Sequence, residues 1–300
     1  MASRVLLMNP PSGLYRRDNR CQSRVEDQTV QIVFPPMELA LLAAVARRAG
    51  AEARIEDLPA RGASWEEAER IIHEYAPDYL LINPTTATIS ADLRILATAR
   101  RTNLRCVTMG LGEHLVFNGE KIMQEEPALD IILPVESEGA FEEIVSGARP
   151  ASVRGLIYRT DDGEIRKADN RHLLDDLDSL PFPARDLLDN SLYVSPETGN
   201  PLTVIQGNRG CPSRCIFCPA GTLYGYRVRF RSPENIVLEI RECVEHYGIR
   251  EFLFNGDTFT INKDWVLRLC ALIREGGLDI HWGCNSRVDT FDTERAEALK

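Results

Sequence analysis

The chain has 300 residues, 44% of them hydrophobic and 27% charged, and a formal net charge of −10 at pH 7. This composition predicts a globular protein with room for two modest domains, and it excludes a disordered or fibrous chain. The acidic balance argues against a broad nucleic-acid-binding surface, and the sequence shows neither a signal peptide nor an apolar run of about 20 residues that would span a membrane.

Short apolar runs alternate with longer amphipathic stretches over residues 1–150, which is typical of βα units that build a parallel sheet. The expected strands are 4–8, 53–57, 78–83, 105–109 and 130–133, and the expected helices are 37–49, 65–75, 89–101, 118–125 and 139–145. Five such units predict a flavodoxin-like, doubly wound α/β domain. Ligands bind beyond the carboxyl ends of strands in such sheets, so the candidate ligand loops are 9–15, 83–88, 110–114 and 134–138.

The pattern changes in residues 151–201. The runs 154–160 and 164–167 are joined across Asp161-Asp162-Gly163, which predicts a β-hairpin. The stretch 169–201 is rich in proline and aspartate and predicts a connector with little regular structure.

The βα rhythm restarts at Leu202. The expected strands are 202–206, 251–254 and 279–284, and the expected helices are 233–246, 263–275 and a segment that starts at Thr293. Three units make the first half of a βα barrel, and the sequence stops inside the third helix. We therefore expect residues 202–300 to be part of a second domain that further residues complete.

Three cysteines follow the predicted strand 202–206 directly. Cys211, Cys215 and Cys218 have the spacing C-x3-C-x2-C. In the cytoplasm, which we expect for a chain without a signal peptide, clustered cysteines are better explained as metal ligands than as disulfides. Thiolates suit an iron-sulfur cluster or zinc, but structural zinc normally takes four ligands and no fourth partner is evident nearby. Three further cysteines could be considered as a fourth ligand, but they lie in apolar helix or strand patterns. We expect them to be small buried hydrophobic residues: Cys243, Cys270 and Cys284.

The cysteine spacing, with an aromatic residue before the last cysteine, resembles the signature of the radical S-adenosylmethionine (SAM) superfamily. The resemblance implies a 4Fe–4S cluster on the three cysteines. Its remaining iron would bind the amino and carboxylate groups of SAM, which electron transfer would cleave to a 5′-deoxyadenosyl radical. A small-molecule substrate and a reductant such as flavodoxin or ferredoxin are implied as partners.

The same resemblance implies the residues that would bind SAM. They are Phe217, near the adenine; Asn255, Gly256 and Asp257, at the place of the family's glycine-rich acidic motif; and Ser286 and Arg287, near the SAM carboxylate. The sequence at 255–257 departs from the usual Gly-Gly-Glu, so a turn with a helix cap is the alternative there. An ordinary loop salt bridge is the alternative for Arg287.

Alternate arginines stand close to the cysteines, at Arg227, Arg229 and Arg231. An extended segment would place all three guanidinium groups on one side, where they would attract a carboxylate or an anionic cofactor group. The alternative is a solvated basic edge.

A doubly wound domain before a radical SAM domain resembles the cobalamin-binding subclass of the superfamily. The candidate cobalamin residues are Asn9, Thr85, Gly110, Gly112, His114 and Glu138. The motif Asp-x-His-x-x-Gly is absent, which implies base-off cobalamin without a protein histidine ligand. His114 has the alternative of a hydrogen-bonded loop residue, and the threonines that of a helix cap. The dinucleotide-binding motif G-x-G-x-x-G does not follow the first strand, which argues against the hypothesis of a dehydrogenase.

These resemblances imply a cobalamin-dependent radical SAM enzyme that transfers a methyl group to an unactivated carbon. Within the family, the alternative is the oxidative cyclisation of a tetrapyrrole, as in the anaerobic magnesium-protoporphyrin monomethyl ester cyclase. An alternative of another class is a non-catalytic iron-sulfur or corrinoid-binding module. The cofactors implied by the first hypothesis are the 4Fe–4S cluster, SAM and cobalamin.

Overall fold

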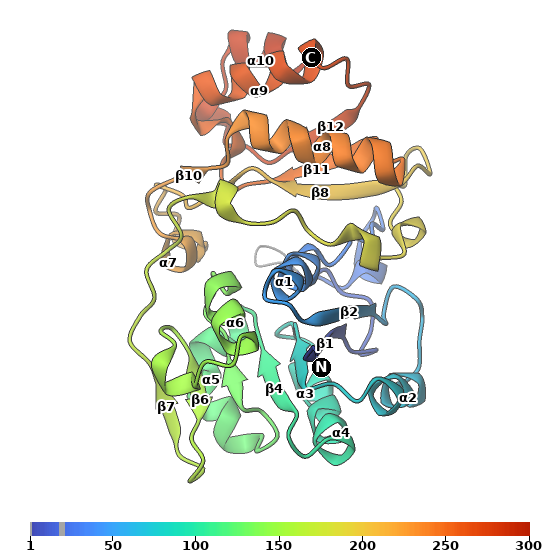
Figure 1. Cartoon of the computed structure of the whole chain (residues 1–300). Helices are drawn as coiled ribbons and strands as arrows, with labels where there is room; N and C mark the ends of the chain where they lie inside the picture. The colour runs from blue at the N-terminus through green and yellow to red at the C-terminus, as the bar shows by residue number, and fades with distance from the viewer. Residues whose placement is uncertain (1, 18–21) are drawn as a thin grey trace. The chain divides into compact units, whose positions relative to one another are not determined.

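The computed structural model describes residues 2–17 and 22–300 and contains two compact units (Figure 1). The first comprises the described residues up to His172 together with Pro181–Asp189. The second comprises Leu173–Leu180 and the chain from Asn190 to Lys300.

The first unit is built on a seven-stranded sheet. Its parallel strands are β1 (Arg4–Asn9), β2 (Glu52–Asp57), β3 (Tyr79–Ile82), β4 (Val107–Gly110) and β5 (Ile131–Ile132). They lie in the order β2-β1-β3-β4-β5, which confirms the predicted flavodoxin-like topology and puts the switch point between β1 and β3. The predicted hairpin forms β6 (Ile157–Arg159) and β7 (Ile165–Lys167), which extend this sheet antiparallel beyond β5.

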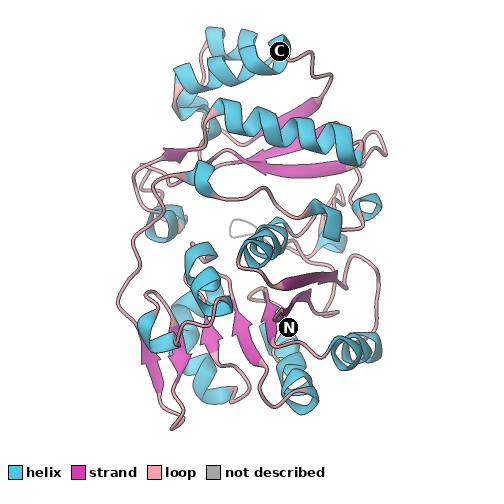
Figure 2. Ribbon diagram, viewed as in Figure 1, coloured by secondary structure: helices cyan, strands magenta, loops and turns pink. Residues whose placement is uncertain are grey.

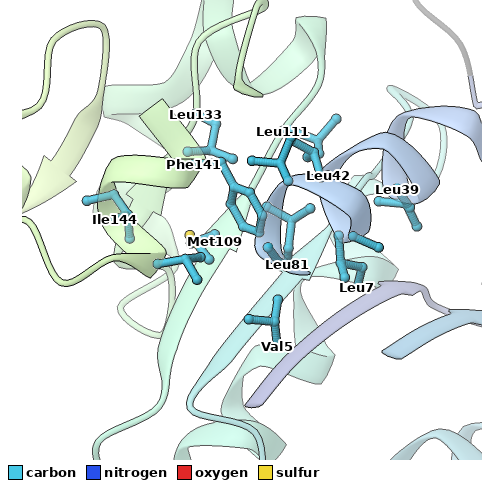
Figure 3. Packing of buried hydrophobic residues seen from close by; sticks show 14 of the residues in the cluster. Val5, Leu7, Leu39, Leu42, Leu81, Met109, Leu111, Leu133, Phe141 and Ile144 are labelled. Carbon is cyan, nitrogen blue, oxygen red and sulfur yellow. The ribbon is translucent and has the colours of Figure 1, made fainter. Parts of the chain in front are cut away.

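Two apolar layers cover the faces of this sheet. The helices are α1 (Met37–Arg48), α2 (Trp65–Tyr75), α3 (Ile89–Asp92), α4 (Arg94–Thr102), α5 (Glu113–Glu125) and α6 (Glu138–Val145). Side chains alternate along β1, so Val5 and Leu7 join the layer under α1 and α6, whereas Leu6 and Met8 join the layer under α2, α4 and α5. Figure 3 shows the first layer, in which Phe141 of α6 lies among side chains from the strands and α1. Burial of both faces explains the continuous apolar runs that predicted these strands.

Two helices in the first unit differ from the sequence prediction. The helix predicted over 89–101 is divided at Leu93 into α3 and α4, and another helix begins earlier than predicted. The predicted start of the fourth helix at residue 118 is wrong, because the corresponding helix α5 begins at Glu113. Gly112 precedes it with φ +113°, and a Cβ there would lie 3.3 Å from both Asn83 Oδ1 and Pro84 O. His114 therefore lies in the first turn of α5 and not in a ligand loop, because a left-handed glycine starts the helix earlier than its apolar periodicity suggests.

The second unit contains three parallel strands in the order β12-β11-β8 (Figure 2). They are β8 (Leu202–Gln206), β11 (Glu251–Asn255) and β12 (His281–Cys284), and they alternate with α8 (Pro233–Tyr247), α9 (Lys263–Glu275) and α10 (Thr293–Leu299). The core contains a group of aromatic rings, among which Phe259 lies 5.1 Å from Phe254 and 5.0 Å from Trp265 between ring centroids. The three predicted βα units of a half barrel are thus confirmed.

Short elements that sequence analysis did not predict flank the cysteines. They are the antiparallel pair β9 (Asn208–Arg209) and β10 (Arg229–Phe230), and the helix α7 (Ala220–Tyr224). Between β7 and β8 the chain contains only the 3-10 helices η3 (Leu177–Ser179), η4 (Arg185–Leu187) and η5 (Asn190–Leu192), which confirms a connector with little regular structure. No helix in the described part of the chain is long and apolar enough to cross a membrane.

The buried carboxyl of Glu251, at the start of β11, makes the stability of the second unit depend on pH. Burial opposes ionisation of its carboxyl, but hydrogen bonds from Thr198, Asn200 and Ser195 outweigh this, so the pKa of Glu251 lies below its ordinary value of 4.5. A carboxyl whose pKa is lowered by folding stabilises the folded state above the ordinary pKa, and this contribution is lost as the pH falls through the lowered pKa.

We therefore expect the free energy of unfolding of the second unit to decrease below pH 4.5, and we expect Glu251→Gln to lack this part of the decrease. Hydrogen exchange of peptides from β8 and β11, compared between the parent and the variant at each pH between about 3 and 6, would measure the effect for the second unit. Equal pH slopes in the parent and the variant would contradict it.

Candidate functional site

The cysteine loop lies at the carboxyl end of β8, between β9 and α7. Cys211 is buried, Cys215 is half-buried and Cys218 is exposed. The amide of Cys211 donates to Gly225 O at 3.1 Å and that of Cys218 to Cys215 O at 3.1 Å. The backbone is thus held at the first and last cysteine, and the residues between them form no regular element.

Within residues 2–17 and 22–300, no three His, Cys, Asp or Glu side chains are already gathered as a metal-binding group. The donor set of the cysteine loop nevertheless fits an iron-sulfur cluster, because it offers three free thiols within eight residues of irregular chain. The three sulfur atoms would come together around the bound cluster.

The other described cysteines have a different environment. Cys243 and Cys270 are buried in the apolar core of the second unit, which confirms the prediction for these two residues, whereas Cys284 is half-buried and packs against that core. Burial raises the pKa of the Cys270 thiol and raises that of Cys284 to about 11. Cys106, in the core of the first unit, has a pKa raised by burial to about 12. Burial in apolar surroundings makes these thiols poor metal ligands.

The structure brings the predicted acidic motif against the cysteine loop. Asn255 is the last residue of β11, and the next residues turn towards Cys211. The Gly210 amide donates to Asp257 Oδ2 at 2.8 Å, and Cys211 Sγ lies 3.6 Å from Thr258 Oγ1. These contacts follow from the parallel pairing of β8 with β11, which places their carboxyl ends at one edge of the sheet.

Sequence analysis missed Asn208, which holds these two loops together. Its Oδ1 accepts a hydrogen bond from the Asp257 amide at 2.9 Å, and its side chain lies against Gly256. A Cβ at Gly256 would lie 2.8 Å from Asn208 Oδ1. The signal in the sequence was an asparagine next to Arg209 in the short stretch between β8 and the first cysteine, which is too common to single out.

The loop after β12 also reaches the cysteine loop. Arg287 Nη1 lies 3.6 Å from Cys215 Sγ, while its Nη2 forms an ion pair with Asp289 Oδ2 at 2.7 Å. The predicted alternative of a loop salt bridge therefore exists alongside the proximity to Cys215. The hydroxyl of Ser286 contacts those of Thr260 and Thr290. Phe217 is 86% exposed, so its ring is available to a ligand.

The prediction that three neighbouring arginines attract an anion is wrong, as is the alternative of a solvated edge for two of them. Arg229 is buried and donates to Leu174 O at 2.6 Å and to Tyr224 O at 2.7 Å. Arg231 is buried and pairs with Glu239 at 2.5 Å, and only Arg227 is exposed, where it pairs with Asp175. The guanidinium groups of Arg229 and Arg231 support the fold around the cysteine loop because internal acceptors already engage them.

Gly210, directly before the first cysteine, has a backbone conformation and surroundings that favour glycine. Its φ is +91°, and a Cβ there would lie 2.3 Å from Arg227 O. We expect Gly210→Ala to lower the free energy of unfolding of the second unit by about 1–3 kcal/mol, because the new methyl group strains and displaces the backbone.

Hydrogen exchange of peptides from β8 and β11 would measure this loss for the second unit. Gly248→Ala is a matched control, since Gly248 also has a positive φ of +66° but a Cβ there would meet nothing within 4 Å. A loss for Gly210→Ala no larger than that for the control would contradict the expected clash.

The candidate cobalamin residues lie at the carboxyl edge of the first sheet: Asn9 and Gly110 end β1 and β4, Thr85 lies in the loop after β3, and Gly112, His114 and Glu138 lie at the starts of α5 and α6. Asn9 Nδ2 donates to Asp57 Oδ1 at 3.0 Å, and the buried Asn9 Oδ1 has no hydrogen-bond partner among the residues that the structure describes. Gly110 makes room for α5, because a Cβ there would lie 2.5 Å from Leu115 Cδ1. Gly112 adopts φ +113° before α5, and Glu138 is the buried first residue of α6.

The threonines and His114 form local hydrogen bonds. The hydroxyls of Thr85 and Thr88 lie 2.9 Å apart, and each accepts from the backbone amide of the other. His114 Nδ1 lies 3.2 Å from Thr86 Oγ1 on the exposed start of α5. The alternative of a hydrogen-bonded histidine is therefore present in the structure, whereas the alternative of a helix cap is not, because Thr88 at the start of α3 makes no side-chain capping hydrogen bond.

A buried ion pair that sequence analysis missed spans the switch point. Arg17 Nη1 lies 2.7 Å from Asp92 Oδ2, with both side chains almost completely buried. Asp92 also accepts from Ser12 Oγ at 2.5 Å and from Thr88 Oγ1 at 2.6 Å. The loop after β1 and the segment after β3 are thus joined by one charged network.

Comparisons with known proteins agree with this architecture. The family model described as the radical SAM superfamily matches residues 205–300. An uncharacterised methyltransferase of Pyrococcus horikoshii is 31% identical over 99% of this chain and 62% of its own length. The anaerobic magnesium-protoporphyrin IX monomethyl ester cyclase of Cereibacter sphaeroides is 25% identical over 89% of this chain and 45% of its own length.

A solved structure shows the same fold. It is that of TsrM from Kitasatospora setae, a radical SAM methyltransferase with cobalamin and a 4Fe–4S cluster bound, which matches with a TM-score of 0.73 and 18% identity over all of this chain and 59% of its own. The chain thus spans about half to two thirds of the length of the proteins that it resembles. It is a radical SAM protein, related in sequence to a protein named as a methyltransferase and to the anaerobic cyclase.

Proposed function

We propose that the protein holds a 4Fe–4S cluster on Cys211, Cys215 and Cys218 and binds SAM beside it. When bound, the cluster supplies the electron that cleaves SAM and leaves one iron open to it. The observation that carries this proposal is the meeting of the cysteine loop with the loops after β11 and β12, at 2.8 Å between Gly210 N and Asp257 and at 3.6 Å between Arg287 and Cys215.

The residues of this edge have separable roles towards SAM. The exposed ring of Phe217 offers a surface for the adenine. The turn at Asn255, Gly256 and Asp257 offers acceptors for the amino group, and Ser286 and Arg287 offer donors for the carboxylate. Each assignment places the complementary charge or hydrogen-bonding group opposite one part of SAM.

The first unit is proposed to bind cobalamin in its base-off form at the carboxyl edge of its sheet. Cobalamin would carry the methyl group for transfer. The switch point between β1 and β3 marks this edge as the ligand site, and the buried Asn9 Oδ1 is an acceptor for an amide N–H of the corrin side chains. Thr85, Gly110, Gly112 and Glu138 shape the same edge, and His114 Nδ1 contacts Thr86 Oγ1 beside it.

The proposed reaction is methyl transfer to an unactivated carbon, supported by the relative over 99% of the chain that is named as a methyltransferase. Oxidative cyclisation is a second candidate because the anaerobic cyclase is also a relative. The test is anaerobic reconstitution with iron, sulfide and cobalamin, followed by reduction in the presence of SAM. Formation of 5′-deoxyadenosine supports a radical enzyme. A brown protein with intact cluster and cobalamin that leaves SAM uncleaved would indicate a non-catalytic module, and a colourless protein without acid-labile sulfide would indicate zinc.

A further inference from the structure

We propose that Asn208 and Asp257 form a latch that fixes the cysteine loop to the loop after β11. Both are then positioning residues for the cluster site, and the carboxylate of Asp257 acts on the cysteine loop itself. This inference rests on the proposed function for the identity of the bound group. The latch is made of contacts within the second unit and exists before any cofactor binds.

Asn208 supplies the buried half of the latch. Its side chain is 1% exposed, so its carboxamide must find partners inside the protein. Oδ1 accepts from the Asp257 amide at 2.9 Å, and Nδ2 approaches Thr258 O at 3.5 Å. These contacts fix the orientation of the carboxamide and place it against Gly256, where a Cβ would lie within 2.8–3.0 Å of its atoms. The glycine in this motif is therefore required by Asn208.

Asp257 supplies the charged half. Its backbone is held by Asn208, and its Oδ2 accepts from the Gly210 amide at 2.8 Å. A hydrogen bond to a carboxylate is stronger than one to a neutral acceptor. Gly210 directly precedes Cys211, the first proposed ligand. The hydrogen bonds from Asn208 to Asp257 and from Asp257 to Gly210 therefore form a closed ring with the chain 208–210.

The position of Cys211 follows from this ring. Its Sγ lies 3.6 Å from Thr258 Oγ1, in the same turn that Asn208 holds. Residues that orient metal ligands commonly change metal affinity about 10- to 100-fold when they are replaced. Replacement of Asn208 or Asp257 is therefore expected to weaken cluster retention, although neither residue is a proposed iron ligand.

The experiment compares Asp257→Ala, Asp257→Asn and Asn208→Ala with the parent. Asp279→Ala is the control, because Asp279 is an exposed aspartate between α9 and β12. The first readout is hydrogen exchange of the peptide 207–219 in the protein without iron. We expect about tenfold faster exchange in Asp257→Ala and Asn208→Ala, the effect of losing about one hydrogen bond. Asp257→Asn keeps an acceptor for the Gly210 amide and should exchange at a rate between that of the alanine variant and the parent.

The second readout is iron and sulfide content after reconstitution and gel filtration. It should fall in the same order, with the parent and Asp279→Ala equal. If Asp257 served only to bind SAM through its charge, the alanine and asparagine variants would both keep parental exchange and full iron, and the latch would be overturned. Asn208→Ser is a smaller change at the same position. If Asn208→Ala and Asn208→Ser both exchanged at the parental rate, the latch would also be overturned.

The two readouts separate this inference from the proposed function. A parent that takes up no iron refutes the cluster assignment, while hydrogen exchange still tests the latch. Peptides from α8 serve as an internal reference, since faster exchange confined to 207–219 identifies the loss of the latch rather than of the fold.

Discussion

Replacement of any one of the three loop cysteines by alanine is expected to abolish the iron-sulfur cluster. Cys211→Ala, Cys215→Ala and Cys218→Ala each leave two thiols, and a cluster corner without its thiolate is exposed to water and lost. Iron and acid-labile sulfide per chain, with the visible absorbance of the anaerobically reconstituted protein, measure the loss. The effect should be close to complete in each variant, because within the described residues no other cysteine stands in this loop to replace the missing ligand.

Two buried cysteines of the same unit are the matched controls. Cys243→Ala and Cys270→Ala remove a thiol from the apolar core and should leave the iron content unchanged. They are expected to lower the free energy of unfolding by about 1 kcal/mol, the usual cost of a small cavity. A full iron complement in any of the three loop variants, or its loss in a core variant, would contradict the assignment of the ligands.

The fold was predictable where the local pattern of apolar and capping residues in the sequence reflects the element that these residues form. In β1 and β3 almost every residue is apolar because both faces of the sheet are covered, and α8 begins at Pro233 after the cap Ser232, as its sequence indicates. The start of α5 was not predictable in the same way. Its first turn carries Glu113 and His114, which have no apolar period, and the left-handed glycine before it acts through contacts with Asn83 and Pro84.

The site was predictable only in part, for a similar reason. The cysteine spacing is local, so it marked the cluster loop directly. The role of Asn208 depends on Asp257, 49 residues away, and the pair of Arg17 and Asp92 joins residues 75 apart. Such contacts arise from the register of parallel strands, which brings distant loops to one edge and leaves no periodic signal in the sequence. The alternation of the arginines near the cysteines misled in part for the same reason, since Leu174 O, an acceptor of Arg229, lies 55 residues away in the sequence.

Asp92→Ala is expected to destabilise the first unit by about 3–5 kcal/mol, because it leaves the buried guanidinium of Arg17 without its counter-charge. The side chains of Arg17 and Asp92 are 5% and 0% exposed, so water cannot replace the lost carboxylate without opening the structure. Ser12 and Thr88 would lose an acceptor at the same time. Hydrogen exchange of peptides from β1 and β3 measures this loss for the first unit alone, which bulk unfolding of a two-unit chain does not.

Two further variants decide whether the unpaired charge is the cause. Asp186→Ala breaks the exposed pair with Arg47, whose side chains are 41% and 50% accessible, and should cost about 0–1 kcal/mol. The double variant Arg17→Met with Asp92→Leu removes both charges and should be more stable than Asp92→Ala alone, since apolar replacement of a buried pair is often nearly neutral. If the double variant instead lost as much stability as the two single changes together, the loss would come from packing and hydrogen bonds. In that case Arg17 and Asp92 would stabilise the loops after β1 and β3 through their packing and hydrogen bonds and not through their opposite charges.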